Sequence, residues 1–212
     1  KHLTSLGIGN YMNNDFISGS PGILPKSSYF EKLYRGSWNA NTTISMAIGQ
    51  GELLLTPIQM ANITAILANR GFYYTPHIVK SISGQDEIDS NFTQKKFCSI
   101  QPEHFIPIIE GMAQVIAGEN GTGKDGKIPE INICGKTGTA QNPHGEDHSI
   151  FIAFAPMQNP EIAIAVYVEN GGWGATWAVP IASLMIEKYL TEKITNAAQE
   201  DFILNGSLIR KE

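Results

Sequence analysis

CGKTGTAQ, residues 134–141, is the stretch around which the rest of this 212-residue chain is organised. It follows an alternating apolar run and precedes a polar turn, so it is predicted to be a strand that leads into a loop. Lys136 supplies a positive charge and Thr137 and Thr139 supply short hydroxyl donors, a combination suited to binding an anion. Gly138 has no Cβ, which allows a ligand or another backbone to come close.

Strand geometry places a condition on this interpretation. Lys136 and Thr137 are adjacent, so their side chains are expected on opposite faces of the strand. Both can serve one ligand only if the strand borders a cleft and the ligand lies along its edge. The alternative is that Lys136 is an ordinary exposed lysine.

Composition narrows the class of protein. The net charge is −5, without a block of like charges, so no nucleic-acid partner is expected. Cys98 and Cys134 lack metal-ligand spacing; two buried thiols are favoured over a disulfide. The apolar runs are shorter than the ~20 residues that cross a membrane, and no signal peptide is visible. Because the chain starts at Lys1, it is expected to be a piece of something longer.

The clearest helix is predicted to begin at Thr56. Thr56 is the expected N-cap, Pro57 the first helical residue and Gln59 the partner in a capping box, with Gly71 as the stop. Residues 72–82 are expected to form a short hairpin or edge strand, and residues 83–99 an exposed polar segment.

The second half of the chain is predicted to alternate helices and strands. A helix is expected to end near Gly118, followed by a Gly-rich loop over 118–127. Strands are expected over 131–140, 149–155 and 161–169, the last two forming an antiparallel hairpin. A final helix from Ala178 to Tyr189 would pack across the sheet. Residues 191–212 are expected to be a weakly attached tail.

Three other groups could suggest sites. Residues 118–124 (GENGTGK) fit most of a phosphate-binding loop, but Asp125 stands where a hydroxyl should follow, so an ordinary loop is favoured. The acidic and histidine residues within 144–148 lie in a turn, so a solvated loop is favoured over a metal site. Trp38 and Trp173 sit in polar loops, where each could wall a binding site or anchor its loop.

The chain resembles the C-terminal part of the transpeptidase domain of class B penicillin-binding proteins, and among them the elongation-system group, penicillin-binding protein 2. K-T-G is one of the motifs typical of serine β-lactamases and penicillin-binding proteins. Further landmarks occur in family order over residues 5–190: GILP (22–25), IGQGE (48–52), TPIQ (56–59), GKTGTAQ (135–141), FAP (154–156), VENGG (168–172) and AVP (178–180).

This resemblance implies an acyl-serine mechanism on the D-Ala-D-Ala end of peptidoglycan stem peptides, with penicillins as mimics of the donor. Lys136 would support the proton network and positive field around the nucleophile. Thr137 and Thr139 would receive the substrate carboxylate, and the Thr139 N–H would donate to the oxyanion. Gly138 would keep the strand edge open for the acyl chain. No cofactor or metal is expected.

One family motif is missing from these residues. The nucleophile of the family lies in S-x-x-K on a helix, and no serine here has a lysine three positions later. The triplet at 37–39 (SWN) does not occupy the family place of S-x-N. The nucleophile is therefore expected upstream of Lys1, and the isolated chain is expected to be inactive and to expose apolar surface.

The predicted fold is α/β of the α+β type, an antiparallel sheet flanked by helices within the penicillin-binding protein and serine β-lactamase fold. Residues 1–190 are assigned to the transpeptidase domain and 191–212 to the tail. Implied partners are stem peptides, β-lactams and a membrane glycosyltransferase of the elongation machinery. The implied location is the periplasmic face of the inner membrane, with an anchor outside this chain. A class D β-lactamase, a β-lactam sensor domain and a non-catalytic scaffold remain alternatives.

Overall fold

The computed structural model describes residues 1–84 and 88–208. The predicted polar segment 83–99 and tail 191–212 therefore lie partly outside the described residues. The order of the elements is α1 (His2–Ser5), α2 (Ser27–Tyr34), α3 (Ala40–Ala47), α4 (Pro57–Ala68), β1 (Phe72–Tyr73), α5 (Ser90–Thr93), β2 (Lys96–Phe97), η1 (Pro102–His104), α6 (Phe105–Ala117), η2 (Lys124–Gly126), β3 (Cys134–Ala140), β4 (His148–Ala155), β5 (Ile162–Val168), α7 (Ala178–Thr191) and α8 (Ala197–Asn205).

The three predicted strands form one antiparallel sheet in the order β3-β4-β5. Lys136 on β3 pairs with Ile152 on β4, and Ile152 pairs in turn with Ala165 on β5. The apolar character of β4 follows from its position, because a central strand is covered on both faces.

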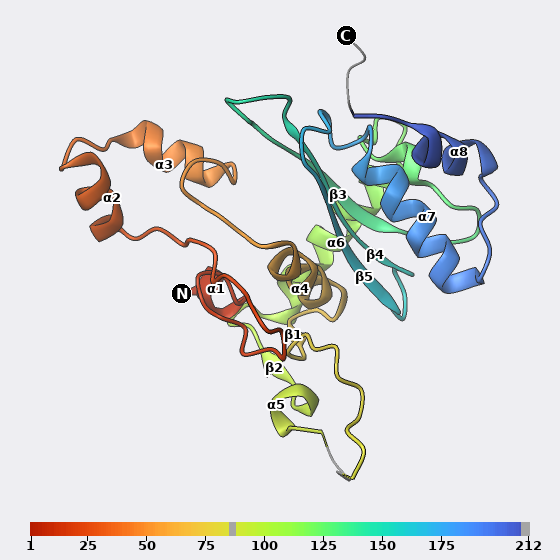
Figure 1. Ribbon diagram of the computed structural model, residues 1–212, viewed down its shortest axis with the longest axis horizontal. Coiled ribbons are helices and arrows are strands. Elements are labelled where there is room, and N and C mark those ends of the chain that lie inside the picture. The colour runs from red at the N-terminus through yellow and green to blue at the C-terminus, as the bar shows by residue number, and fades with distance from the viewer. Residues whose placement is uncertain (85–87, 209–212) are drawn as a thin grey trace.

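Helices cover the two faces of this sheet (Figure 1). The α7 side holds a core that includes Phe151, Ala153 and Val166 from the strands and Ala182 and Ile186 from α7. The opposite side holds a second core in which α4 and α6 pack against the starts of β3 and β5 and the end of β4. The predicted mixed architecture, with an antiparallel sheet between helices, is confirmed.

Helix α4 begins as the sequence predicts. Thr56 accepts a hydrogen bond from the Gln59 N–H, Gln59 returns one to the Thr56 N–H, and Pro57 is the first residue. The helix ends at Ala68, before the expected stop at Gly71. Arg70 (φ +57°) and Gly71 (φ +117°), which follow the helix, both have positive φ angles.

Two lobes extend from this body (Figure 1). Helices α2 and α3 form an arm that projects from one side, with Phe30 as the buried residue of α2. The other lobe carries a two-stranded ladder in which Phe72 pairs with Phe97. Of the residues 72–82 expected to form a hairpin or edge strand, only Phe72–Tyr73 do so, and their partner strand lies within the segment 83–99 that was expected to be exposed and polar.

The described part of the 191–212 segment differs from a weakly attached tail. Residues 197–205 form α8, which contacts α7. Phe202 stacks on Trp177 with ring centroids 4.9 Å apart, and Gln199 donates to the carbonyl of Asp125. The buried carboxylate of Glu187 accepts hydrogen bonds from the backbone and side chain of Thr195. Packing and polar contacts therefore hold the segment in place.

Candidate functional site

Strand β3 carries the predicted site, residues 136–139, and distributes their side chains over both faces of the sheet. Thr137 lies opposite Phe151 in the register, and Phe151 belongs to the core under α7. Because side chains alternate along a strand, Thr137 and Thr139 face the α7 side, while Lys136 faces the side of α4 and α6.

Within the described residues, β3 is an outer strand of its sheet. The Thr137 carbonyl accepts a 2.7 Å hydrogen bond from the Lys136 ammonium, so this carbonyl points away from β4. In an antiparallel ladder every second residue directs both its N–H and its C=O to the same side. The backbone groups of Thr139 therefore also point to the open edge, while a ligand lying along that edge stays a prediction.

Both threonine hydroxyls already have one protein partner. The Thr137 hydroxyl lies 2.8 Å from the Thr122 hydroxyl, and the Thr139 hydroxyl accepts the Gly174 N–H at 3.3 Å. A hydroxyl has one proton and two lone pairs. The bond from Gly174 occupies one lone pair and leaves the Thr139 proton available to an anionic ligand.

The close backbone approach expected at Gly138 comes from Gly174. A Cβ on Gly174 would lie 2.4 Å from the Gly138 oxygen and 2.7 Å from the Ile150 oxygen, which is too close for any side chain. A Cβ on Gly138 would meet the Ile150 side chain at 3.4 Å, an ordinary contact. The geometry therefore requires glycine at 174, while a role for Gly138 toward a ligand stays a prediction.

Ser149 fixes the loop that presents Gly174. Its side chain is fully buried, and its hydroxyl donates to the Trp173 carbonyl at 2.9 Å and accepts the Ala178 N–H at 3.1 Å. The Gly172 N–H adds a 2.7 Å bond to the Asp147 carbonyl. The loop between β5 and α7 is thus attached on both sides of Trp173, to Asp147 just before β4 and to Ser149 within β4.

Two hollows adjoin β3. One, of about 490 Å³, lies beside Lys136 and is otherwise walled by the second half of α6 and residues 118–122. The other, of about 760 Å³, begins where β3 ends and lies between residues 140–148 and residues 45–54, with Tyr167 on its wall. Of β3 itself, Lys136 lines the first hollow and Ala140 lines the second.

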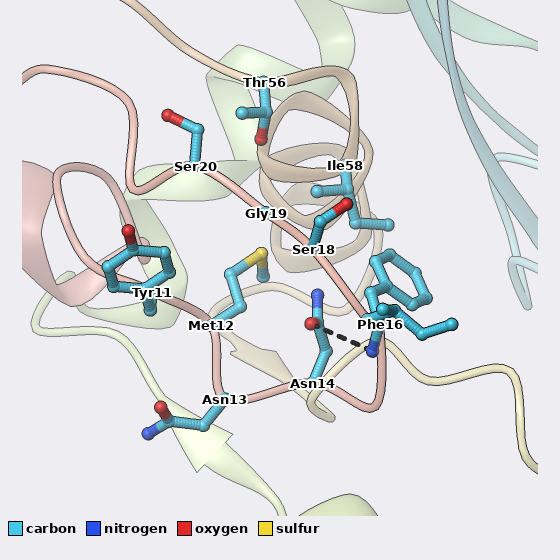
Figure 2. A pocket seen from close by; sticks show the side chains of 11 residues that line it. Tyr11, Met12, Asn13, Asn14, Phe16, Ser18, Gly19, Ser20, Thr56 and Ile58 are labelled. Carbon is cyan, nitrogen blue, oxygen red and sulfur yellow. Dashed lines mark hydrogen bonds between the residues drawn. The ribbon is translucent and has the colours of Figure 1, made fainter.

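A further hollow of about 400 Å³ lies away from β3, among residues 11–20 and the start of α4 (Figure 2). The Asn14 side chain turns back to accept the Phe16 N–H at 3.4 Å. The described residues that line this hollow carry amide and hydroxyl groups but no carboxylate, lysine or histidine. Tyr11 is thus the single acid–base group among its described lining residues.

The strand that carries the candidate site starts inside the buried core. Cys134, the first residue of β3, is fully buried, and burial raises the pKa of its thiol to about 11, against a weaker opposing effect of the Arg70 charge. Cys98 is half-buried, and both cysteines are free thiols.

The turn over residues 144–148 is a local hydrogen-bonded structure. The Asp147 carboxylate accepts the Asn142 N–H, and the His148 ring accepts the Asn170 N–H. Over residues 1–84 and 88–208, no group of three or more His, Cys, Asp or Glu side chains could hold a metal. In the same residues no helix is long and apolar enough to cross a membrane.

Sequence reasoning did not identify three residues that shape the site: Thr122, Ser149 and Gly174. Thr122 lies within the segment 118–124 that resembles a phosphate-binding loop, and its hydroxyl meets Thr137. Ser149 is fully buried and directly precedes the apolar part of β4. That polar position beside an apolar run was the one available signal.

Comparisons with known proteins agree with this geometry. The family profile described as "Penicillin binding protein transpeptidase domain" matches residues 1–187. Peptidoglycan D,D-transpeptidase MrdA of Acinetobacter baumannii is 31% identical over 233 aligned residues, covering 98% of this chain and 33% of that protein. The chain thus spans about a third of the length of the curated relatives that it matches.

Solved structures lead to the same family. The Pseudomonas aeruginosa PBP2 complex with WCK 5153 matches with a TM-score of 0.79 and 34% identity, covering 92% of this chain and 44% of that one. Helicobacter pylori PBP2, in its complex with MreC, matches with a TM-score of 0.75 and 28% identity over 88% of this chain and 34% of that one. The resemblance to penicillin-binding protein 2 and the predicted fold are confirmed.

Proposed function

We propose that this chain, which belongs to the penicillin-binding protein transpeptidase family, forms one wall of the active site of a peptidoglycan D,D-transpeptidase. The observation that supports this most directly is the open edge of β3. There the backbone groups of Thr137 and Thr139 point outward, with the Lys136 ammonium on one face of the strand and the Thr137 and Thr139 hydroxyls on the other. An extended peptide beside that edge would reach all of them, as in recognition by strand addition.

The proposed reaction has two acyl-transfer steps. The oxygen of a serine bonds to the carbonyl carbon of the penultimate D-alanine, the C–N bond breaks, and the serine proton passes to the departing terminal D-alanine. An amine of a neighbouring stem peptide then attacks the ester and restores the serine. The same serine opens the ring of a β-lactam and keeps the acyl group.

Each residue of β3 has a role in this scheme. The Lys136 charge supports the proton network around the serine, and the Thr137 and Thr139 hydroxyls hold the carboxylate of the substrate. The Thr139 N–H donates to the oxyanion that develops in the transition state, where such donors have their largest effect. Gly138 leaves space for the acyl chain.

We propose that the nucleophile comes from sequence outside these 212 residues. No serine of the chain starts an S-x-x-K motif, and the matched relatives are about three times as long. The isolated chain would therefore be inactive.

The proposed partners follow from the same family membership. They are D-Ala-D-Ala stem peptides, β-lactams and a membrane glycosyltransferase of the elongation machinery, at the periplasmic face of the inner membrane. The complex of the H. pylori relative with MreC supports a place in a multiprotein assembly. A nucleic-acid partner is not proposed, because the net charge of −5 would oppose binding to phosphates.

Intact-mass analysis with peptide mapping tests the proposal in the full-length protein. After penicillin treatment we expect one stable adduct on a serine outside residues 1–212, and none on the isolated chain. Lys136→Ala should slow adduct formation by about a hundredfold or more. Lys127→Ala, at another exposed lysine, should not change it.

Three outcomes would contradict the proposal. An adduct within residues 1–212 would mean that the nucleophile is misplaced. Fast release of hydrolysed penicillin would identify a β-lactamase of the same fold. No adduct on either protein would leave the non-catalytic scaffold in its place.

A further inference from the structure

Trp38 and Trp173 have different environments, although both lie in polar loops. The Trp38 ring stacks on Phe30 with centroids 5.6 Å apart, and its Nε1 donates to Glu31 at 2.9 Å. Trp38 therefore anchors the arm formed by α2 and α3. The Trp173 side chain is 77% exposed. Exposing the large apolar surface of an indole to water is unfavourable, so the exposed position of Trp173 is not explained by packing.

The backbone around Trp173 is held more firmly than its exposure suggests. The Ser149 hydroxyl binds the Trp173 carbonyl at 2.9 Å and lies 3.2 Å from the Gly174 carbonyl. The Gly172 N–H binds Asp147, and the Thr176 N–H returns to the Trp173 carbonyl at 2.9 Å. Hydrogen bonds thus fix the position from which the indole projects.

That position adjoins the proposed carboxylate site. The Gly174 N–H bonds to the Thr139 hydroxyl at 3.3 Å. Two covalent bonds separate the Gly174 nitrogen from the Trp173 Cα, so this Cα lies within about 6 Å of the Thr139 hydroxyl. An indole side chain is long enough to span that distance.

We propose that Trp173 is a specificity-determining residue that packs against the apolar group next to the ligand carboxylate. This inference rests on the proposed function. In a stem peptide that group is the methyl of the terminal, departing D-alanine; in a penicillin it is the pair of methyls beside the carboxylate. Trp173 therefore reads the leaving-group side of the ligand, opposite to the acyl chain.

Two penicillins with the same acyl side chain test this in the full-length protein. One carries the two methyls beside the carboxylate, and the other has hydrogens in their place. We expect Trp173→Ala to lower the second-order rate of acylation by the methylated compound about three- to tenfold, the range for losing one or two methyl contacts on a partly open surface. The rate with the unmethylated compound should change by less than twofold. Trp173→Phe should restore most of the difference.

Tyr189→Ala is the matched control. Tyr189 is 61% exposed, and it lies eleven residues after the start of α7, about 17 Å along the helix from the loop. Its loss should leave both rates unchanged.

The remaining results separate the possible failures. If the wild-type protein is acylated by neither compound, the proposed function fails. If both are acylated and Trp173→Ala slows them equally, Trp173 supports the loop and has no role in specificity. If Trp173→Ala changes neither rate, the indole does not contact the ligand.

Discussion

Cys134 is the residue at which the core and the candidate site meet. It lies at the start of β3, two residues before Lys136, and is fully buried in the core cluster that also contains Ile66 and Phe154. Because burial disfavours the thiolate, its pKa rises from an ordinary 9.0 to about 11. The thiol is therefore a packing group that is neutral at physiological pH.

We expect Cys134 to react with iodoacetamide about a hundredfold more slowly than a thiol of ordinary pKa, because that shift lowers the thiolate fraction by about that factor. A neutral group with a raised pKa stabilises the fold fully below pH 9, and this contribution is lost as the pH rises toward 11. Mass mapping of labelled thiols at pH 8 measures the rate, with the half-buried Cys98 as the internal comparison.

Urea titrations of the wild type and Cys134→Ala between pH 8 and 10.5 isolate the stability effect. The wild type should lose more stability over this range than the variant. Rapid labelling of Cys134 in the native state, or parallel pH profiles, would contradict the assignment.

For single residues, the sequence indicates the chemical groups of the candidate site but not the residues that these groups contact. Lys136, Thr137 and Thr139 stand in one motif, so their residue types alone indicate an anion site. The partners are remote along the chain: Thr122 lies 15 residues from Thr137, and Gly174 lies 35 residues from Thr139. Only the fold brings such residues together, and a single sequence does not encode that contact visibly.

Helix α4 is the element that joins the N-terminal loop to the sheet. The buried Gln59 amide lies within hydrogen-bond distance of the carbonyls of Gly7, Asn10 and Pro21, while its oxygen caps the helix. One side chain thereby satisfies backbone groups that would otherwise be buried without a donor.

We expect Gln59→Met to lower the free energy of unfolding by about 2–4 kcal/mol, because it removes a cap and leaves buried carbonyls without donors at similar volume. Hydrogen exchange should speed up over residues 7–23, where the loop loses its attachment. Gln158→Met, at an exposed turn position, should change stability by less than about 0.5 kcal/mol. Unchanged exchange in the loop would show that other contacts hold it.

Local signals decide which elements could be predicted. Helix α4 has a capping box and a proline at its first residue, so its start was visible. Helices α3 and α8 also have a capping asparagine each, Asn39 and Asn196, but neither helix has a buried residue to mark a core-facing side. α8 forms against α7 through Phe202 and its neighbours, a tertiary effect that periodicity does not report.

At the scale of the whole molecule the two faces of the sheet are covered unequally. On β4 the side chains that face α7 are all buried, whereas Ile150 and Ile152 on the other face are only half-buried, and Tyr167 of β5 is 37% exposed. The assignment of residues 1–190 and 191–212 to separate units stays a prediction, although α8 packs on the domain.

We expect the isolated 212-residue chain to expose this face. It should bind a hydrophobic dye several times more strongly, per mole, than the full-length protein and elute partly as a dimer at micromolar concentration. Ile152→Thr in the isolated chain should reduce both effects, and Ile108→Thr, on an exposed position of α6, serves as a comparison. Equal dye binding by the two proteins would mean that the rest of the protein leaves the face open.

The open edge of β3 has one more consequence. Backbone groups that can receive an extended peptide can equally receive a strand of another copy, and unprotected edges of this kind promote aggregation. A lysine in the middle of such a strand opposes that pairing, because an added strand would displace water from around its charged ammonium group. We therefore expect the Lys136 ammonium to oppose pairing between copies in addition to its proposed role in the chemistry.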